Sequence, residues 1–257
     1  MKQNKKATFL EYERPLLVAM VQEKTPNEAI CTIMNSLYDG AEAFGIQLCN
    51  LLPEYRNLET LKRIFSYCEG RPIYITSYRG GASRDLTDGE RAELLLLGLE
   101  AGATLCDVMG DFFCPTPDQL TFDAEAVERQ KKLIDEIHAR GGEVLISTHT
   151  SRYFSEEEVL AYAREQIARG ADVVKIVGKS NSEDEQMASL QTIHRLNREL
   201  ACPFLYLVGG SHTRLVRQVG PALGCCMYLC VERYLPVSAK MQPRLRATKT
   251  LRDAMLL

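Results

Sequence analysis

The feature of this chain that most constrains its fold is an alternation of short apolar runs with longer amphipathic stretches, repeated eight times along the sequence. The short runs are rich in residues that favour strands, and such an alternation is typical of parallel βα units. Each run is mostly apolar throughout, as expected of strands that are covered on both faces. The predicted strands are Leu16–Val21, Gly45–Leu48, Pro72–Ser77, Leu105–Met109, Glu143–Ser147, Asp172–Val177, Phe204–Val208 and Gly224–Leu229.

The longer stretches repeat apolar residues at helical spacing, and several begin with a capping residue. Thr87 stands three residues before Glu90, and Ser155 stands three residues before Glu158, which is the spacing of a capping box. The predicted helices are Pro26–Tyr38, Leu58–Cys68, Asp88–Ala101, Asp123–Ala139, Glu156–Arg169, Ser182–Leu200, Thr213–Val219 and Arg244–Met255.

Eight such units without a Pro/Ser-rich linker predict one α/β domain, a (β/α)8 or TIM barrel over residues 1–257 with a short N-terminal extension at residues 1–14. The length suits this fold, since such barrels have about 250 residues. The alternative α/β architecture is an open, doubly wound sheet. The turn after Val21 lacks the glycine-rich dinucleotide-binding fingerprint of that fold, so the barrel is favoured.

The charge balance and the hydropathy exclude several classes of partner. The formal net charge is −3, and no basic stretch exceeds a few residues, which argues against nucleic acid and against a membrane surface. No apolar run reaches the roughly 18 residues of a membrane span. The charged segment Met1–Arg14 has no signal-peptide core. We therefore expect a cytoplasmic protein.

Nine cysteines are present, an odd number without paired spacing, and most lie in apolar runs. This pattern indicates reduced thiols in the core. Cys225, Cys226 and Cys230 come nearest to a metal motif, but no second Cys/His pair stands at zinc spacing. We expect no metal site.

Two strand ends carry residues that suit catalysis. In a barrel the active site lies at the carboxyl ends of the strands. One predicted strand embeds Lys175 among β-branched residues, and the preceding one runs into His149. A buried lysine has a depressed pKa, and its free amine attacks ketones and aldehydes. Adjacent strands lie about 4.8 Å apart, so Lys175 and His149 can share one substrate.

Each of these residues also has a purely structural interpretation. Lys175 could be an ion-paired barrel lysine, and His149 alone could be a loop histidine whose hydrogen bonds are satisfied within the fold. Their position on adjacent strand ends favours catalysis, with Lys175 as the amine nucleophile of a Schiff-base lyase and His149 as its proton-transfer partner. Such chemistry requires no cofactor.

Four segments carry a resemblance to a known family. They are Ser147-Thr148-His149, Asp172-Val173-Val174-Lys175-Ile176, Gly210-Ser211-His212-Thr213-Arg214 and Ser238-Ala239-Lys240-Met241-Gln242. In order and spacing these segments resemble the Ser-x-His, Asp-h-x-Lys-h, Gly-x-x-Ser-Arg and Ser-Ala-Pro-Gly-Gln motifs of the type I 3-dehydroquinate dehydratases of the shikimate pathway. The resemblance covers nearly the whole chain.

This resemblance implies conversion of 3-dehydroquinate to 3-dehydroshikimate and water. Lys175 would form a Schiff base with the ring ketone, and His149 would move the α-proton. Arg214 would hold the carboxylate of this small anionic carbonyl substrate, while Gln242 and Ser238 would close over the ring hydroxyls. The resemblance also implies a homodimer, for which we expect the exposed leucine-rich segment Leu94–Leu99 to form an interface.

The chain departs from the family pattern at three strand ends. Gln47-Leu48-Cys49 replaces a substrate-binding Glu-x-Arg, so Gln47 is the expected ligand there. Met109 takes the place of the Glu that orients the catalytic histidine. Asp107 and Asp111 are the candidates to replace it, although we expect Asp107 to face the other side of its strand. Arg79 matches the family's arginine after a one-residue shift and is a further candidate ligand.

Three hypotheses follow. The first is a divergent 3-dehydroquinate dehydratase. The second is a Schiff-base lyase or aldolase-like enzyme of the same fold that acts on a less hydroxylated carbonyl carboxylate. The third is a catalytically impaired homologue that binds a metabolite of the pathway, which the loss of the orienting Glu favours.

Overall fold

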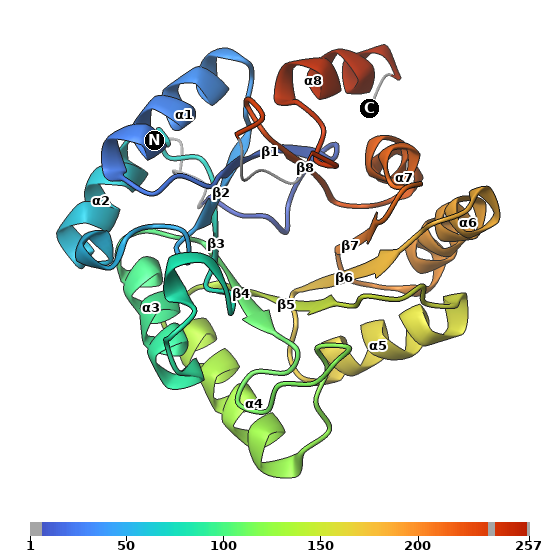
Figure 1. The fold of residues 1–257 in the computed structure, drawn as a ribbon, viewed down its shortest axis with the longest axis horizontal. Helices are drawn as coiled ribbons and strands as arrows, with labels where there is room; N and C mark the ends of the chain where they lie inside the picture. Colours follow the sequence, from blue (N-terminus) through green and yellow to red (C-terminus); the bar gives the residue numbers. More distant parts are fainter. Residues whose placement is uncertain (1–6, 236–239, 256–257) are drawn as a thin grey trace, which may run out of the picture.

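Eight parallel strands form a nearly closed barrel inside a ring of eight helices (Figure 1). The coordinates are a computed structural model, which describes residues 7–235 and 240–255. The strands are β1 (Leu16–Val21), β2 (Ala43–Gln47), β3 (Ile73–Thr76), β4 (Leu105–Met109), β5 (Glu143–His149), β6 (Val173–Lys179), β7 (Phe204–Gly209) and β8 (Met227–Cys230). The helices are α1 (Pro26–Tyr38), α2 (Leu58–Ser66), α3 (Asp88–Glu100), α4 (Ala124–Ala139), α5 (Glu156–Ala168), α6 (Glu183–Glu199), α7 (Arg214–Val219) and α8 (Leu245–Ala254).

The predicted barrel is thus confirmed, and the main differences lie at strand ends. β5 continues through Thr148 to His149, because both residues join the parallel ladder opposite Ile176 and Val177 of β6. Backbone pairing, which is independent of hydropathy, decides where these strands end. The capping boxes of α3 and α5 form as predicted, with Thr87 and Ser155 as the capping residues.

The barrel has one seam. Successive strands pair in parallel from β1 to β7, and β1 also pairs with β8, but no ladder joins β7 to β8 in the described strands. At the amino end of the seam the backbone N–H of Cys226 donates to the carbonyl of Phe204 at 2.9 Å. No backbone ladder continues from this point toward the carboxyl ends of the two strands, where barrel enzymes bind their ligands.

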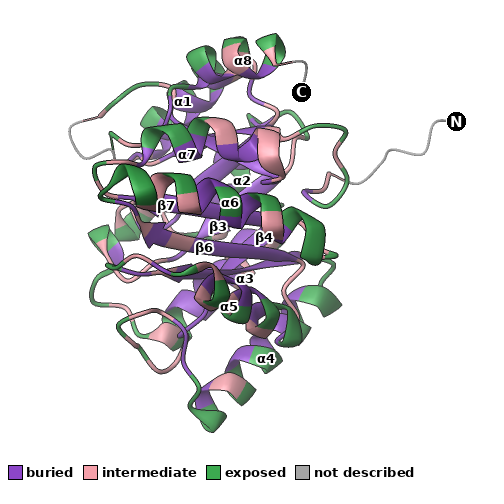
Figure 2. Ribbon diagram, turned by 90° about the vertical axis from the view of Figure 1, so that its right-hand side faces the viewer, coloured by how far each residue is buried: buried purple, intermediate pink, exposed green. Residues whose placement is uncertain are grey.

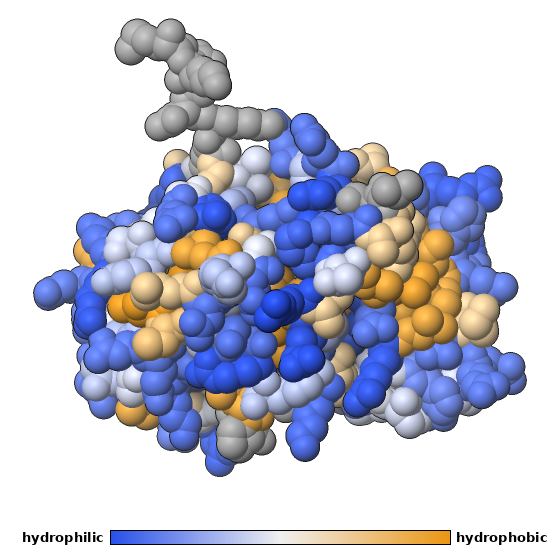
Figure 3. All heavy atoms as spheres, turned by 90° about the horizontal axis from the view of Figure 1, so that it is seen from above, coloured by the Kyte–Doolittle hydropathy of each residue, from blue (hydrophilic) through white to orange (hydrophobic). Residues whose placement is uncertain are grey.

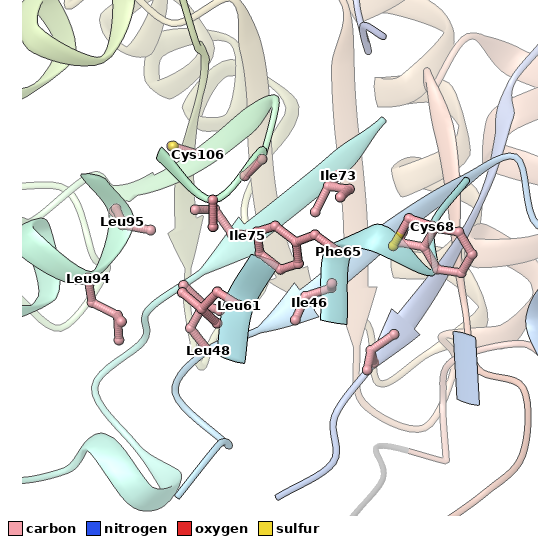
Figure 4. Close-up of a cluster of buried hydrophobic side chains, with 14 of the residues drawn as sticks. Ile46, Leu48, Leu61, Phe65, Cys68, Ile73, Ile75, Leu94, Leu95 and Cys106 are labelled. Atoms are coloured by element: carbon pink, nitrogen blue, oxygen red, sulfur yellow. The ribbon is translucent and has the colours of Figure 1, made fainter. Parts of the chain in front are cut away.

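Apolar side chains fill the layer between the strands and the helices. Buried residues dominate the strands, whereas the outer faces of the helices are exposed (Figure 2). Viewed over α1 and α8, the exterior is mostly hydrophilic, with hydrophobic residues in separate areas (Figure 3). Figure 4 shows the cluster where α2 and α3 cover β2, β3 and β4.

The leucine-rich segment of α3 belongs to this layer, which corrects our expectation of an exposed interface at Leu94–Leu99. Leu94 and Leu95 are buried in the cluster, and Leu96, Leu97 and Leu99 pack partly against it. Consecutive leucines on a helix point in different directions, so the segment contacts both the sheet and neighbouring helices. A homodimer stays a prediction.

The N-terminal extension takes part in the core at the amino end of the barrel. Phe9 is fully buried, and its ring meets the ring of Tyr74 edge-to-face at 6.5 Å. Its backbone N–H donates to the carboxylate of Glu143, the first residue of β5, at 3.0 Å. The hydroxyl of Thr8 donates to the same carboxylate. This segment therefore covers the opening opposite the strand ends that carry His149.

We expect Phe9→Ala to lower the free energy of unfolding by about 3–5 kcal/mol, because it leaves a cavity against Tyr74. Leu10→Ala is the matched control, since Leu10 is 38% exposed, and it should change the free energy by about 0.5 kcal/mol or less. Urea unfolding followed by circular dichroism measures both. Equal losses in the two variants would show that the extension does not stabilise the barrel through Phe9.

Candidate active site

The side chain of Lys175 points into the barrel, as the sequence predicts. Lys175 is the third residue of β6 and is only 4% exposed. Its Nζ lies 2.9 Å from the hydroxyl of Tyr74 and 3.2 Å from Oδ2 of Asp107. The hydroxyl of Tyr78, two residues after β3, lies 2.5 Å from the same nitrogen. These partners belong to the β3 and β4 side of the barrel, so the amine reaches across its interior.

Asp107 also faces the interior, which corrects the expectation that it faces away. Strand alternation explains the result, because Cys106 and Val108 on either side of it pack in the helix-side cluster. The Asp107 carboxylate is buried and accepts hydrogen bonds from three hydroxyl groups. Two come from the tyrosines that contact Lys175, and the third comes from Ser147 at 2.5 Å. Asp107 is therefore the anionic partner of the buried amine.

Burial and pairing act against each other on both members of this ion pair, with different outcomes. It lowers the pKa of Lys175, because the ammonium loses its hydration, and the adjacent Asp107 carboxylate offsets only part of that effect. Burial also opposes ionisation of Asp107, but the positive charge of Lys175 and the hydroxyl donors outweigh it, so the pKa of Asp107 is lowered. The site thus holds a carboxylate beside an amine that gives up its proton more readily than an exposed lysine.

An amide orients His149, the last residue of β5. Its Nδ1 lies 2.9 Å from Oε1 of Gln119, which also accepts the backbone N–H of His149 at 3.2 Å. Because an amide oxygen only accepts, Nδ1 carries the proton and Nε2 keeps its lone pair. Burial, followed by the positive charge of Lys175, lowers the pKa of His149 to about 3, so the imidazole is neutral near pH 7.

Gln119 supplies the orientation that the resemblance assigns to a Glu at the end of β4, which Met109 replaces in this chain. Gln119 was not identified from the sequence. Met109, at that position, is a buried core residue. Gln119 lies in the loop between β4 and α4, where no periodic pattern identifies it. The loop passes close over Gly110, since a Cβ there would stand 2.6 Å from the Gln119 carbonyl. Gly110 therefore allows the approach that brings Gln119 to the imidazole.

Lys175 and His149 open into one cavity of about 120 Å³. Four of the predicted site residues line it, namely Lys175, His149, Gln47 and Gln242. The remaining lining residues are Met20, Tyr78, Val177, Leu207, Arg217 and Leu229. The rings of Tyr78 and His149 pack edge-to-face at 5.1 Å. An amine, a neutral imidazole and a phenol thus face the same small space.

Amide side chains border this cavity at the ends of β1 and β2. Asn50 donates to Oε1 of Gln47 at 3.0 Å, and Gln22 donates to Oε1 of Gln242 at 3.5 Å. Gln22, Gln47 and Asn50 also line an adjoining, wider cavity of about 590 Å³. Near the end of β2, the amides of Gln47 and Asn50 therefore offer uncharged donors and acceptors to this region.

The predicted ligand Arg214 lies elsewhere. It is exposed at the start of α7 and lines a neighbouring cavity of about 250 Å³, which shares Gln242 with the Lys175 cavity. Arg217, one turn later, is buried and lines the Lys175 cavity. Sequence reasoning missed Arg217, although its spacing from Arg214 places the two on adjacent positions of one helix face.

Arg79 and Ser238 complete the predicted set. Arg79 does not line the cavity; it makes ion pairs with Asp88 at 2.6 Å and with Asp111 at 2.7 Å. The inward position belongs to Tyr78, so strand alternation turns Arg79 outward to connect α3 with the loop after β4. Ser238 lies outside the described residues.

The described residues were also compared with the requirements of a metal site and of a membrane-spanning helix. Within residues 7–235 and 240–255, no three His, Cys, Asp or Glu side chains gather as metal ligands would. All nine cysteines fall in this part of the chain and are free thiols. None of the helices described is both long and apolar enough to span a bilayer.

Comparison with known proteins gives the family and the fold. The sequence model of the type I 3-dehydroquinase family matches residues 21–251. The comparison with curated proteins finds no match. The structure is similar to 3-dehydroquinate dehydratase from Geobacillus kaustophilus, with a TM-score of 0.80 at 18% identity over 96% of this chain and 93% of that one. It is also similar to the type I enzyme from Clostridium difficile, with a TM-score of 0.79 at 18% identity over 96% and 94% of the two chains.

The lowered pKa of His149 makes stability depend on pH. An unfolded histidine binds a proton near pH 6.5, whereas folded His149 stays neutral down to about pH 3. The free energy of unfolding should therefore be constant above pH 6.5 and fall by about 2 kcal/mol between pH 6.5 and pH 5 through this residue.

Urea unfolding of the wild type and of His149→Gln over pH 5–7.5 measures this effect. The variant should lose that part of the pH dependence. His194→Gln, which changes an exposed histidine of α6, should keep the wild-type profile. Parallel profiles for wild type and His149→Gln would contradict a neutral, buried imidazole.

Proposed function

Because the chain belongs to the type I 3-dehydroquinase family, we propose that it is a lyase that dehydrates 3-dehydroquinate to 3-dehydroshikimate through a Schiff base on Lys175. One observation carries the proposal: a buried amine and a neutral imidazole with a free Nε2 line the same cavity. The first residue can form the imine, and the second can move the protons of the elimination.

Imine formation starts at Lys175. The lone pair of Nζ forms a bond to the ketone carbon of the substrate, and the π electrons of the carbonyl move to its oxygen. Starting from the ammonium, two protons leave the nitrogen and depart with that oxygen as water, so the iminium has the same charge as the ammonium. Tyr78 is suited to relay these protons, because its hydroxyl lies 2.5 Å from Nζ and 2.5 Å from Oδ2 of Asp107.

Elimination then depends on His149. Its Nε2 takes a proton from the carbon next to the iminium, and the C–H electrons form the double bond of an enamine. The enamine expels the hydroxyl on the next carbon, which takes the proton from His149 and leaves as water. Hydrolysis of the conjugated iminium releases the product and restores Lys175. The iminium acts as an electron sink, which is why an amine nucleophile is needed.

A second candidate function is a Schiff-base lyase or aldolase-like reaction on a different keto acid. The composition of the cavity favours it. Met20, Val177, Leu207 and Leu229 give apolar walls, and Gln47 stands in place of a charged ligand. Such walls suit a ring or chain with fewer hydroxyl groups than dehydroquinate. The third hypothesis, a catalytically impaired metabolite-binding homologue, is weakened by Gln119, which fixes the tautomer of His149.

On the first proposal the protein acts in the shikimate pathway, toward aromatic amino acids, in the cytoplasm. It would bind a small anionic carbonyl compound without a cofactor. A homodimer remains part of this proposal through the family alone.

Borohydride reduction tests the imine. Wild-type protein incubated with 3-dehydroquinate and sodium borohydride should gain the mass of one reduced ligand, and peptide mapping should place it on Lys175. Lys175→Ala should give neither adduct nor turnover. Lys132→Ala, which changes a 73% exposed lysine of α4, should behave as wild type.

The other outcomes separate the remaining hypotheses. An adduct without dehydration, or one formed only with another ketone, would favour the second function. Ligand binding without any adduct would favour a metabolite-binding homologue. Turnover by Lys175→Ala at the wild-type rate would exclude both enzyme functions.

The pH dependence of catalysis tests the role of Asp107. We expect kcat/KM to rise with pH as Lys175 loses its proton, through a pKa below the ordinary lysine value. Asp107→Asn keeps an acceptor for the hydroxyls but removes the carboxylate that raises the pKa of Lys175. In Asp107→Asn, the increase of kcat/KM should therefore occur at a pH about 1–3 units lower than in the wild type.

Asp172→Asn is the matched control, because Asp172 pairs with His138 at the amino end of β6. Asp172→Asn should leave the pH profile of kcat/KM unchanged. A profile that stays unmoved in Asp107→Asn would show that this carboxylate does not set the proton affinity of the nucleophile.

A further inference from the structure

The loop between β4 and α4 holds two residues in the left-handed backbone region. They are Phe113, with a φ of 72°, and Gln119, with a φ of 50°. Neither is a glycine, and a side chain makes this conformation unfavourable unless the surrounding structure imposes it. Gln119 is the residue that orients His149. Contacts elsewhere in the structure must therefore offset the strain of this loop.

Arg79 provides such contacts at the start of the loop. Its Nη1 donates to Oδ1 of Asp111 at 2.7 Å, and its Nη2 donates to the carbonyl of Asp111 at 2.9 Å. Its Nε and Nη2 also donate to the two carboxylate oxygens of Asp88, at 3.0 Å and 2.6 Å. Asp88 in turn accepts the backbone N–H of Phe113 at 2.9 Å. One guanidinium thus joins the first turn of α3 to the loop.

A continuous set of hydrogen bonds leads from Asp111 to the histidine. Oδ2 of Asp111 accepts the backbone N–H of Thr116 at 2.8 Å. The carbonyl of Thr116 accepts the N–H of Gln119 at 3.1 Å, and its hydroxyl oxygen accepts the N–H of Leu120 at 3.0 Å. Gln119 then accepts from the backbone of His149 and contacts its ring. The position of Gln119 therefore depends on the position of the Asp111 carboxylate.

From this connection we propose that Arg79 is a positioning residue, which holds the β4–α4 loop in the conformation in which Gln119 orients His149. Arg79 does not line the cavity of Lys175, so it acts through the loop and not on the ligand. The inference deepens the proposed function and rests on it only for the kinetic measurement described below.

Other cations hold other parts of this loop. Arg169 donates to the carbonyls of Gly110 and Thr121, at the two ends of the loop. Arg152 pairs with Asp118 at 2.9 Å, but its side chain is 47% exposed, and exposed ion pairs contribute little. Residues 111–116, between these anchors, are held through Arg79.

Asp111 depends on Arg79 more than Asp88 does. Asp111 is 1% exposed, and within residues 7–235 and 240–255 no second cation lies within 4 Å of its carboxylate. Asp88 keeps Arg91 at 3.5 Å. Removal of Arg79 would leave the Asp111 carboxylate buried and unpaired, which is costly enough to displace the backbone that carries it. The substitution Arg79→Met should therefore release the loop at Asp111 and let Gln119 leave the imidazole.

Arg252 provides a matched control for this substitution. It is fully buried and forms a two-point ion pair with Glu42, at 2.6 Å and 3.0 Å, between α8 and the residue before β2. Loss of either arginine should destabilise the barrel, but only loss of Arg79 should affect His149. A further variant, Arg79→Lys, keeps the charge but lacks the forked geometry that reaches both carboxylates, so its effects should be intermediate.

The tautomer of His149 tests the proposal without any catalysis. Heteronuclear NMR of the imidazole nitrogens, assigned with His149→Gln, should show a protonated Nδ1 in the wild type and in Arg252→Met. Arg79→Met should show a mixture of the two tautomers, and Arg79→Lys a smaller share of the second one. Thermal unfolding checks that the variants fold.

A wild-type tautomer in folded Arg79→Met, or a wild type without a protonated Nδ1, would overturn the proposal. If Arg79→Met does not fold, the comparison of Arg79→Lys with Arg252→Met decides in the same way. Identical tautomers in those two variants would then refute the role of Arg79.

Turnover of 3-dehydroquinate gives a second measurement. Arg79→Met should lower kcat by about tenfold or more, because a small displacement of a catalytic group is sufficient for such a loss. KM should change by about twofold or less, since Arg79 does not contact the ligand. In a Gln119→Ala background the same substitution should lower kcat by about twofold or less, because both residues act through one contact.

An equal loss of kcat in both backgrounds would place the effect of Arg79 outside Gln119, for example at the adjacent Tyr78, and would contradict the proposal. A wild type that does not dehydrate 3-dehydroquinate would refute the proposed reaction instead. The tautomer measurement would then still decide whether Arg79 positions His149.

Discussion

The interior of this barrel is organised around a buried amine. An ammonium inside a closed sheet loses its hydration, and such a loss is tolerated only when a compensating charge and hydrogen bonds are close. Asp107, Tyr74 and Tyr78 provide these from β4, β3 and the end of β3, two and three strands away from β6. Ser147 holds the carboxylate in turn. The polar interior is therefore one connected network, and the reactivity of Lys175 depends on its balance between burial and the Asp107 charge.

The tautomer of His149 depends on another group than those that surround the amine of Lys175. An acid beside an imidazole fixes its tautomer and also strengthens it as a base. The amide of Gln119 fixes the tautomer without adding negative charge, so His149 stays neutral and weakly basic. Orientation and basicity of the imidazole are therefore set by different groups: Gln119 sets the first, and burial with the nearby charges sets the second.

Sequence patterns predicted the repeating units, the inward lysine and the histidine at the next strand end, because each depends on local periodicity. The inward position of Asp107 was accessible from the alternation of β4 and was assigned to the wrong face. Gln119 could not be found in this way, since its role depends on how a nonperiodic loop folds over Gly110. The burial of Arg217 and the exposure of Arg214 depend on the rotation of the short helix α7, which a sequence motif does not specify; Arg214 stays a predicted ligand that lines the neighbouring cavity. Arg79 pairs with Asp88 and Asp111 and does not line the cavity, and the motif match could not show this because a shift of one residue reverses the side chain.

The seam between β7 and β8 gives the cavity an asymmetric wall. Arg217 follows β7 in the chain and Gln242 follows β8, and both line the cavity beside the strands that no ladder joins. Arg217 also donates to the thioether of Met241 at 3.4 Å, so side chains bridge this part of the wall where backbone hydrogen bonds do not. A molecule bound against these side chains would add contacts at the weakest part of the cylinder and so raise the free energy of unfolding of the whole barrel.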